Sequence, residues 1–328
     1  MTVEDTEDRV APDRFLPSGN EAGSAPGDRK FRPDVEGLRA IAVVLVVLFH
    51  AGVPRVTGGF VGVDIFFVIS GFVITGVLLR ERIGSGRNSI LAFYGRRARR
   101  IIPAATLVII ATVLATYHWL GFLYGGTTAR DGRAAATFWV NFHFIATGTN
   151  YWTSQAPPSP LQNYWSLSVE EQFYVVYPAL FIGAAVFALK RFDFRHRISL
   201  ILGAAVIVSF WWSIVQTSSN ATAAYFSPFT RAWELALGAL VALNARHLAQ
   251  LPRRVAAIIT WLGVGGILLA AFLYTSTTPY PGSAAALPVI STAAVIAGGT
   301  VGFKFGAETV LRLHGGKGLH GAVSMVPE

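Results

Sequence analysis

The sequence predicts an all-α integral membrane protein, a polytopic bundle of about eight transmembrane helices. Of its 328 residues, 53% are hydrophobic and only 14% are charged, whereas a soluble domain carries about 25% charged residues. The mean hydropathy is +0.50. Apolar segments of about 17–25 residues, the length that crosses a bilayer as a helix, recur along the chain. This composition excludes an ordinary soluble enzyme. The lack of cysteine excludes disulfides and thiolate metal sites, and we expect no metal.

The expected elements follow from these segments in order. Residues 1–35 are polar, rich in proline and mixed in charge, which is typical of a disordered cytoplasmic tail. The membrane domain is expected over residues 36–305, and residues 306–328 form a short C-terminal tail. The predicted spans are 38–53, 59–79, 101–123, 168–189, 198–216, 224–244, 255–275 and 284–303.

Basic residues in the loops predict the orientation of the bundle. Arginines are concentrated between the second and third spans, and further basic residues follow the fourth and sixth spans. The loops 217–223 and 276–283 contain neither lysine nor arginine. Because cytoplasmic loops are enriched in these residues, both ends of the chain are expected in the cytoplasm. Basic cytoplasmic loops beside a lipid bilayer also explain the net charge of +9, so we expect the bilayer as a partner and no binding of nucleic acid.

One apolar segment does not fit the pattern of spans. Residues 134–146 are too short to cross a bilayer, so we expect them to be interfacial or re-entrant. They precede an uncharged external loop, 147–166. Its Trp152, Tyr164 and Trp165 could stack on sugar rings, or they could belong to the belt of aromatic residues found at membrane surfaces.

A basic segment precedes the third span. Residues 88–100 are amphipathic, and we expect them to lie on the inner membrane surface before Pro103 opens the span. Its arginines could anchor the chain to anionic lipid, or they could bind phosphate groups, which a guanidinium holds through two hydrogen bonds. They are Arg96, Arg97, Arg99 and Arg100.

Ionisable residues are rare within the spans, and each is a candidate for function because charge is costly in lipid. Arg39 and His50 are eleven residues apart, about 20° from three full helical turns, and so share one face. Asp64 begins the second span at a depth where its carboxylate could hold one nitrogen of His50 and leave the other to act as a base. Alternatively, His50 caps a helix end and Asp64 binds backbone groups. We predict His50 and Asp64 as catalytic candidates.

Two acidic residues open the fourth span. Ser168 and Glu171 match a capping box, with Ser168 as the N-cap and Glu171 three residues later. Capping leaves Glu170 without a role, and we predict it as a further catalytic candidate. In the sixth span, Arg231 and Glu234 lie on one helix face and are expected to neutralise each other.

Five motifs occur in a fixed order along the chain. They are RPDVEGLRAIAVVLVVLFHAG, GGFVGVDIFFVISGFVITGVLL, FYGRRARRIIPA, NYWSLSVEEQFYVVYP and YFSPFTRAWELALGAL. Together they closely resemble the membrane acyltransferase-3 family, whose best-known members are O-antigen acetylase-like proteins of bacteria. The resemblance implies a multi-pass enzyme of the bacterial inner membrane. Its activity would be to transfer an acyl group, usually acetyl, from cytoplasmic acyl-CoA to a hydroxyl of an extracytoplasmic carbohydrate or glycolipid.

The resemblance also assigns roles to individual residues. Arg39 and His50 correspond to the family's paired Arg and His, and Ser70 belongs to its Phe-Phe-x-x-Ser-Gly motif. The Arg-x-x-Arg motif falls on Arg96–Arg99 or on Arg97–Arg100. These arginines, with Arg39, would hold the phosphates of the donor, for which acetyl-CoA is expected.

The implied mechanism carries the donor's pantetheine arm outward beside Ser70 and Gly71. His50 would remove the proton from the acceptor hydroxyl, which then attacks the thioester. A covalent acyl-enzyme on His50 or Ser70 is an alternative route for the same transfer.

The chain departs from the family pattern at its C-terminal end. The family resembles a ten-helix bundle whose last hairpin carries a Ser-Tyr-Ser-x-Tyr-x-Trp-His motif, which is not found after residue 306, so we expect a truncated chain. The main alternative function is a transporter or flippase of envelope glycoconjugates, although the sequence shows no internal repeat. A b-type haem protein is a further alternative, but nothing specifies two histidines at similar depth on facing helices.

Overall fold

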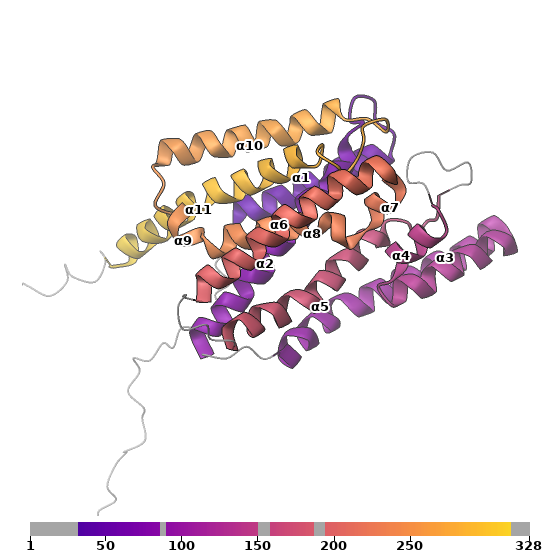
Figure 1. The fold of residues 1–328 in the computed structure, drawn as a ribbon, viewed down its shortest axis with the longest axis horizontal. Coiled ribbons are helices and arrows are strands. Elements are labelled where there is room, and N and C mark those ends of the chain that lie inside the picture. Colours follow the sequence, from indigo (N-terminus) through magenta and orange to yellow (C-terminus); the bar gives the residue numbers. More distant parts are fainter. Residues whose placement is uncertain (1–31, 86–89, 150–157, 187–193, 316–328) are drawn as a thin grey trace, which may run out of the picture. The chain divides into compact units, whose positions relative to one another are not determined.

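The computed structural model describes residues 32–85, 90–149, 158–186 and 194–315 of the chain. Every regular element within these ranges is helical, as expected from the composition. The elements are α1 (Pro33–His50), the 3₁₀ helix η1 (Gly59–Val61), α2 (Gly62–Ser85), α3 (Ile90–Ala136), α4 (Val140–Ala146), α5 (Tyr164–Val186), α6 (Phe194–Ser219), α7 (Ala221–Phe226), α8 (Pro228–Leu243), α9 (Ala245–Leu248), α10 (Arg253–Leu273) and α11 (Ala286–Gly315). The long helices run side by side, with α3 and α10 on opposite sides of the group (Figure 1).

Four helices are long and apolar enough to cross a membrane: α2, α3, α6 and α10. Each of the eight predicted spans overlaps one long helix, but the count of eight membrane crossings stays a prediction. Helix α11 extends beyond residue 305, the expected end of the membrane domain, to Gly315. Most of the expected N-terminal tail, residues 1–31, lies outside the described residues.

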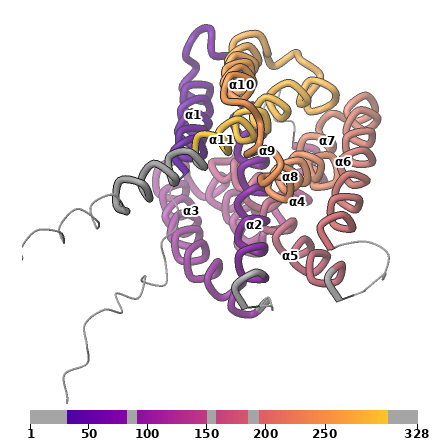
Figure 2. The backbone as a smooth tube through the Cα atoms, turned by 90° about the vertical axis from the view of Figure 1, so that its left-hand side faces the viewer, coloured from indigo at the N-terminus to yellow at the C-terminus, as the bar shows by residue number. Residues whose placement is uncertain are grey.

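Helix α2 lies at the centre of the bundle and packs closely on α8. A Cβ atom added at Gly71 would lie only 1.8 Å from the backbone oxygen of Leu235, and one at Gly238 would lie 2.0 Å from that of Val68. Small residues let helix backbones approach closely in membranes, where van der Waals packing is the main attraction between helices. Figure 2 shows α2 surrounded by other helices. Its most apolar stretch is accordingly mostly buried, whereas less than a third of those of α3, α6 and α10 is buried.

The exposed side of α3 is apolar. Leu107, Trp119 and Phe122 are 69%, 76% and 85% exposed, which would be unfavourable in water but suits a lipid-facing helix. The sequence predicted a surface segment ending before Pro103, whereas α3 continues from Ile90 through this proline. The helical geometry is instead interrupted at Gly121, where φ is 83° and ψ is 176°, values open to glycine because it has no Cβ.

The segment 134–146 is not one continuous helix, and its expected interfacial or re-entrant position stays a prediction. The end of α3, a turn with Phe138 at φ 53°, and the seven-residue α4 occupy it. The capping-box prediction for the next helix is wrong, because α5 begins at Tyr164 and Ser168 lies inside it. The helix starts earlier because residues 161–165 already form hydrogen-bonded turns.

Side-chain caps separate α7 from α8 at the start of the sixth predicted span. The Asn220 side chain accepts a hydrogen bond from the Ala223 backbone N–H, and Ser227 caps α8 in the same way through Phe229 N–H. Pro228 follows Ser227 at the first turn, where its missing N–H costs no helical bond. This break turns Arg231 into the interior of the bundle, where only 1% of the residue is exposed.

Candidate functional site

Three polar side chains meet where α2 packs against α5. The Ser70 hydroxyl on α2 donates a hydrogen bond of 2.5 Å to Glu170 Oε1 on α5. Tyr174, one turn further along α5, donates a 2.6 Å hydrogen bond to the same oxygen. A hydroxyl within hydrogen-bond distance of a carboxylate is the arrangement by which proteins activate a serine oxygen as a nucleophile.

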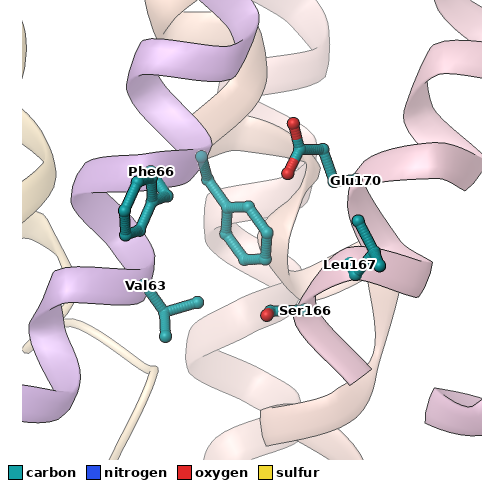
Figure 3. A pocket seen from close by; sticks show the side chains of 6 residues that line it. Val63, Phe66, Ser166, Leu167 and Glu170 are labelled. Carbon is teal, nitrogen blue, oxygen red and sulfur yellow. The ribbon is translucent and has the colours of Figure 1, made fainter. Parts of the chain in front are cut away.

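Glu170 also lines a cavity of about 200 Å³ between α2 and the first turns of α5. Side chains from the two helices face each other across it (Figure 3). The lining residues are Val63, Phe66, Phe67, Ser166, Leu167 and Glu170. A small, mainly apolar pocket with one carboxylate and one hydroxyl can hold a small apolar group next to a reacting centre.

An ion pair supports this cluster from the side of α3. Arg97 donates a 2.7 Å hydrogen bond to Glu171 Oε1, and its guanidinium carbon lies 3.5 Å from the centre of the Tyr174 ring. Arg97 is only partly exposed, and it contacts both Glu171, the neighbour of Glu170 in the chain, and Tyr174, which donates a hydrogen bond to Glu170. Its position favours a structural role over a phosphate-binding one.

The other candidate phosphate ligands lie on or near the surface. Arg96 is paired with Glu81 of α2, whereas Arg99 and Arg100 are exposed. Arg39 forms a 3.3 Å ion pair with Glu36 on its own helix, and both side chains are partly exposed. Exposed pairs of this kind contribute about 0–1 kcal/mol, so these guanidinium groups can exchange their partners for phosphate at little cost.

Asp64 does not pair with His50, which corrects the sequence prediction. Asp64 Oδ1 accepts a 2.9 Å hydrogen bond from Arg231, and Arg231 also binds Glu234 at 3.0 Å, as the sequence predicted. All three side chains are at most 1% exposed. Burial raises the pKa of nearby Tyr280 in the loop before α11, and the Asp64 carboxylate raises it further. Tyr280 therefore stays protonated at neutral pH.

The path of the loop between α1 and α2 explains why Asp64 does not reach His50. A Cβ at Gly59 or Gly62 would meet the backbone oxygen of Leu45 or Ala42, so the start of α2 is level with the middle of α1. His50 lies about 12 Å beyond Ala42 along α1, at the end of the helix. The loop folds back along α1 before α2 begins, and this carries Asp64 away from His50.

His50 is exposed and is oriented by the backbone. Its Nδ1 lies 2.8 Å from the carbonyl oxygen of Val46. A carbonyl only accepts, so Nδ1 carries the hydrogen and Nε2 is the basic nitrogen of the neutral ring. Since α1 and α2 are antiparallel, Ser70 lies roughly 24 Å from His50 along the helix axes. The structure therefore does not bring these two catalytic candidates together.

Gly71 packs against the α8 backbone, so the pantetheine arm cannot pass on that side of α2, whereas a route beside Ser70 stays a prediction. Trp165 is only 1% exposed and packs on Tyr225, so it cannot stack on sugar rings. The Tyr164 hydroxyl donates a hydrogen bond to the backbone oxygen of Ala105 on α3. Trp152 lies outside the described residues.

Sequence reasoning missed one residue and one contact of these clusters. Tyr174 follows Glu170 by four residues, a spacing that places both on one helix face and could have indicated their contact. The partnership of Asp64 with Arg231 joins residues 167 positions apart and had no local signal. Within the described part of the chain, no group of three or more His, Asp or Glu side chains is placed to hold a metal ion.

Comparisons with known proteins place these observations in a family. The family described as "Acyltransferase domain" matches residues 32–312. The chain is 33% identical over 245 residues to the peptidoglycan O-acetyltransferase OatA of Listeria monocytogenes, a match that covers 73% of this chain and 39% of that protein. It is 34% identical over 216 residues to the "Putative peptidoglycan O-acetyltransferase YrhL" of Bacillus subtilis, covering 65% and 33% of the two chains.

A Staphylococcus aureus protein named "Putative O-acetyltransferase SAS0844" is likewise 34% identical over 216 residues, or 65% of this chain and 35% of that protein. The matches thus span between one third and two fifths of the relatives' own length. No solved structure matches the chain significantly. Since the family match covers most of the sequence and includes Ser70, the arginine cluster and Glu170, the chain belongs to the acyltransferase-3 family.

Proposed function

We propose that the protein is an integral membrane O-acyltransferase. It takes an acyl group, acetyl foremost, from acyl-CoA on the cytoplasmic side and transfers it to a hydroxyl of an extracytoplasmic carbohydrate. The names of the relatives favour peptidoglycan as the acceptor. The exposed apolar helices favour a multi-pass location in the bacterial plasma membrane, with the N-terminus in the cytoplasm.

The observation that carries the proposal is the hydrogen bond between Ser70 and Glu170. Ser70 is 9% exposed, and its hydroxyl lies 2.5 Å from the carboxylate oxygen, at the short end of the range for O–H···O hydrogen bonds. Tyr174 holds the same carboxylate oxygen in place. A base positioned in this way contributes about 10²–10⁴-fold to the rate of a transfer reaction.

The reaction follows from this geometry in two transfers. Ser70 Oγ attacks the thioester carbon, its proton passes to Glu170, the C–S bond breaks, and Glu170 returns the proton to the CoA thiolate. The acceptor hydroxyl then attacks the resulting seryl ester, giving its proton to Glu170. The ester bond to Ser70 breaks, and Glu170 returns the proton to the Ser70 oxygen. CoA thiol and the acylated acceptor leave, and the enzyme is regenerated.

The donor's phosphates would bind at the start of α3. Arg99 and Arg100 are exposed there, and Arg96 can release its exposed ion pair with Glu81. Guanidinium groups bind phosphate through paired hydrogen bonds. Arg97 would instead hold α5 in position, and Arg39 would add positive charge on the same predicted cytoplasmic side.

His50 is the competing candidate for the base. Its hydrogen bond to Val46 leaves Nε2 as a proton acceptor at the predicted outer end of α1. Because His50 lies far from Ser70, it can serve only a transfer that takes place at the outer surface. The two candidates therefore predict different reaction centres, and single substitutions distinguish them.

The function is tested by expressing the full chain in a bacterium that lacks O-acetylated peptidoglycan. Muramidase digests of the cell wall are compared by mass spectrometry, with Glu170→Gln as the control. We expect fragments that carry one additional acetyl group with the natural chain and not with the variant. Unmodified glycan in both strains, with the protein present in the membrane, would contradict the proposal.

A further inference from the structure

The cavity beside Glu170 begins one helical turn from Ser70. Val63, Phe66 and Phe67 line it from α2, and they precede Ser70 by seven, four and three residues. Residues with these spacings lie along one face of a helix. An acyl group bonded to the Ser70 oxygen, or presented to it as a thioester, therefore extends next to this cavity.

The size of the cavity limits what can enter it. Its volume is about 200 Å³. Pockets that enclose drug-sized ligands measure about 300–1,000 Å³, so neither a nucleotide nor a disaccharide fits inside. A short hydrocarbon chain fits, and the lining offers it Val63, Phe66, Phe67 and Leu167 as apolar contacts.

The Phe67 ring, which forms one wall of the cavity, is packed against Trp165 on its other side. Phe67 is 1% exposed and packs edge-to-face on Trp165, with ring centres 6.0 Å apart. Trp165 in turn lies 5.4 Å from the guanidinium of Arg231, which the buried carboxylates of Asp64 and Glu234 fix in place. The Phe67 side chain is therefore rigidly positioned against a longer acyl chain. Phe66 is only partly buried, so it can be replaced by a smaller residue with less effect on packing.

We propose that this cavity is the acyl-group subsite, and that Phe66 and Phe67 restrict the enzyme to short acyl groups. The inference rests on the proposed function and adds the residues that set its specificity. In an apolar pocket of fixed size, one methylene changes relative kcat/KM by about 10–200-fold. A cavity of about 150 Å³ holds a benzene molecule, so an acyl chain of up to about six carbons fits here, whereas much longer chains meet the two phenylalanine rings.

The test measures kcat/KM of the purified full chain with acetyl-, hexanoyl- and dodecanoyl-CoA and soluble peptidoglycan oligosaccharides. We expect the natural chain to favour hexanoyl over dodecanoyl by at least about 10-fold. Phe66→Ala should raise the dodecanoyl-to-acetyl ratio by about 10-fold or more, and Phe66→Trp should lower the hexanoyl-to-acetyl ratio. Phe72→Ala, the same truncation in a partly buried residue of α2 that does not line the cavity, should leave both ratios unchanged.

Two results would overturn the inference. One is an unchanged chain-length profile in both Phe66 variants. The other is a higher KM for the oligosaccharide with an unchanged profile, which would make the cavity an acceptor subsite. Equilibrium binding of the same three donors, measured by calorimetry, does not require turnover. Binding that is weaker for dodecanoyl-CoA than for the two shorter donors, without any transfer, would contradict the proposed function alone, whereas equal binding of all three donors would contradict the subsite even if transfer occurs.

Discussion

Neighbouring glutamates on α5 have different surroundings. Glu170 accepts hydrogen bonds from two hydroxyl groups and lines the cavity, whereas Glu171 is bound by the guanidinium of Arg97. Glu170 contacts hydroxyls with which it can exchange a proton, whereas Glu171 is engaged in an ion pair with Arg97. The residue pattern assigned capping to Glu171, but the structure gives it the role of anchoring α3 to α5.

The arginines of the α3 segment should separate into two kinetic classes. Arg97→Gln removes the contact with Tyr174 and the ion pair with Glu171, so we expect a lower kcat with little change in the KM for acetyl-CoA. Arg99→Gln and Arg100→Gln should raise that KM and leave kcat nearly unchanged. Steady-state kinetics on the purified variants measures both constants. A raised KM with unchanged kcat in Arg97→Gln would place Arg97 among the phosphate ligands.

The sequence predicted local partners at this scale and missed distant ones. Arg231 and Glu234 were correctly paired because their three-residue spacing sets their contact. The contact of Ser70 with Glu170 bridges 100 positions and depends on how α2 packs against α5. His50 and Asp64 were expected to meet because their loop was taken as a simple turn, and the backbone path of that loop is not encoded in spacing.

The contact between α2 and α8 combines close backbone packing with a buried ion cluster. Gly71 and Gly238 allow the two backbones to approach, and Arg231 joins the two helices through Asp64. The cavity lies between α2 and α5, and Glu170 belongs to α5. Because α2 forms one wall of this site, the α2–α8 contact fixes the position of that wall. Each half of this contact can be tested by itself.

Gly71→Ala should destabilise the protein, because the added Cβ would overlap the Leu235 backbone oxygen, which cannot rotate away. Overpacking of this kind costs about 1–3 kcal/mol. Gly76→Ala on the same helix is the matched control, since its Cβ would have no neighbour closer than 3.9 Å, and it should be neutral or stabilising by up to about 1 kcal/mol. Thermal unfolding in detergent compares them. Equal midpoints would argue against the close α2–α8 contact.

Arg231→Met should cost about 3–5 kcal/mol, because it leaves the Asp64 and Glu234 carboxylates buried without their cation. Arg39→Met removes an exposed pair and should cost at most about 1 kcal/mol. Chemical denaturation of both variants gives the comparison. If Arg231→Met were as stable as the natural protein, the ion cluster would not hold α2 to α8.

The positions of the helices could largely be predicted from the sequence, since each predicted span overlaps a long helix. Their ends could not, because ends depend on local hydrogen bonds. Residues 161–165 form turns that extend α5 to Tyr164, and Pro103 is accommodated within α3 although proline usually ends or kinks a helix. The break at Gly121 uses a backbone conformation that no apolar pattern indicates.

At the scale of the whole molecule, the orientation in the membrane decides which side supplies the donor. The chain has no cysteine, so single cysteines can be introduced without background. Cysteine at position 85, at the end of α2, should be protected from an impermeant thiol reagent in intact cells, whereas cysteine at position 219, at the end of α6, should react. The reverse labelling pattern would place the arginines of α3 outside the cell and exclude cytoplasmic acyl-CoA as their ligand.

The central claim is that Glu170 is the base of an acyl transfer centred on Ser70, and transfer of radiolabelled acetyl from acetyl-CoA to peptidoglycan oligosaccharides tests it most directly. The assay compares Glu170→Gln with Glu171→Gln and His50→Ala, all purified and shown to be folded. Gln keeps an acceptor for the Ser70 and Tyr174 hydroxyls but takes up no proton. We therefore expect the first substitution to lower turnover by about 10²–10⁴-fold, far more than either of the others. Turnover close to that of the natural chain in Glu170→Gln, with loss of transfer in His50→Ala, would contradict the claim and move the reaction centre to the outer end of α1.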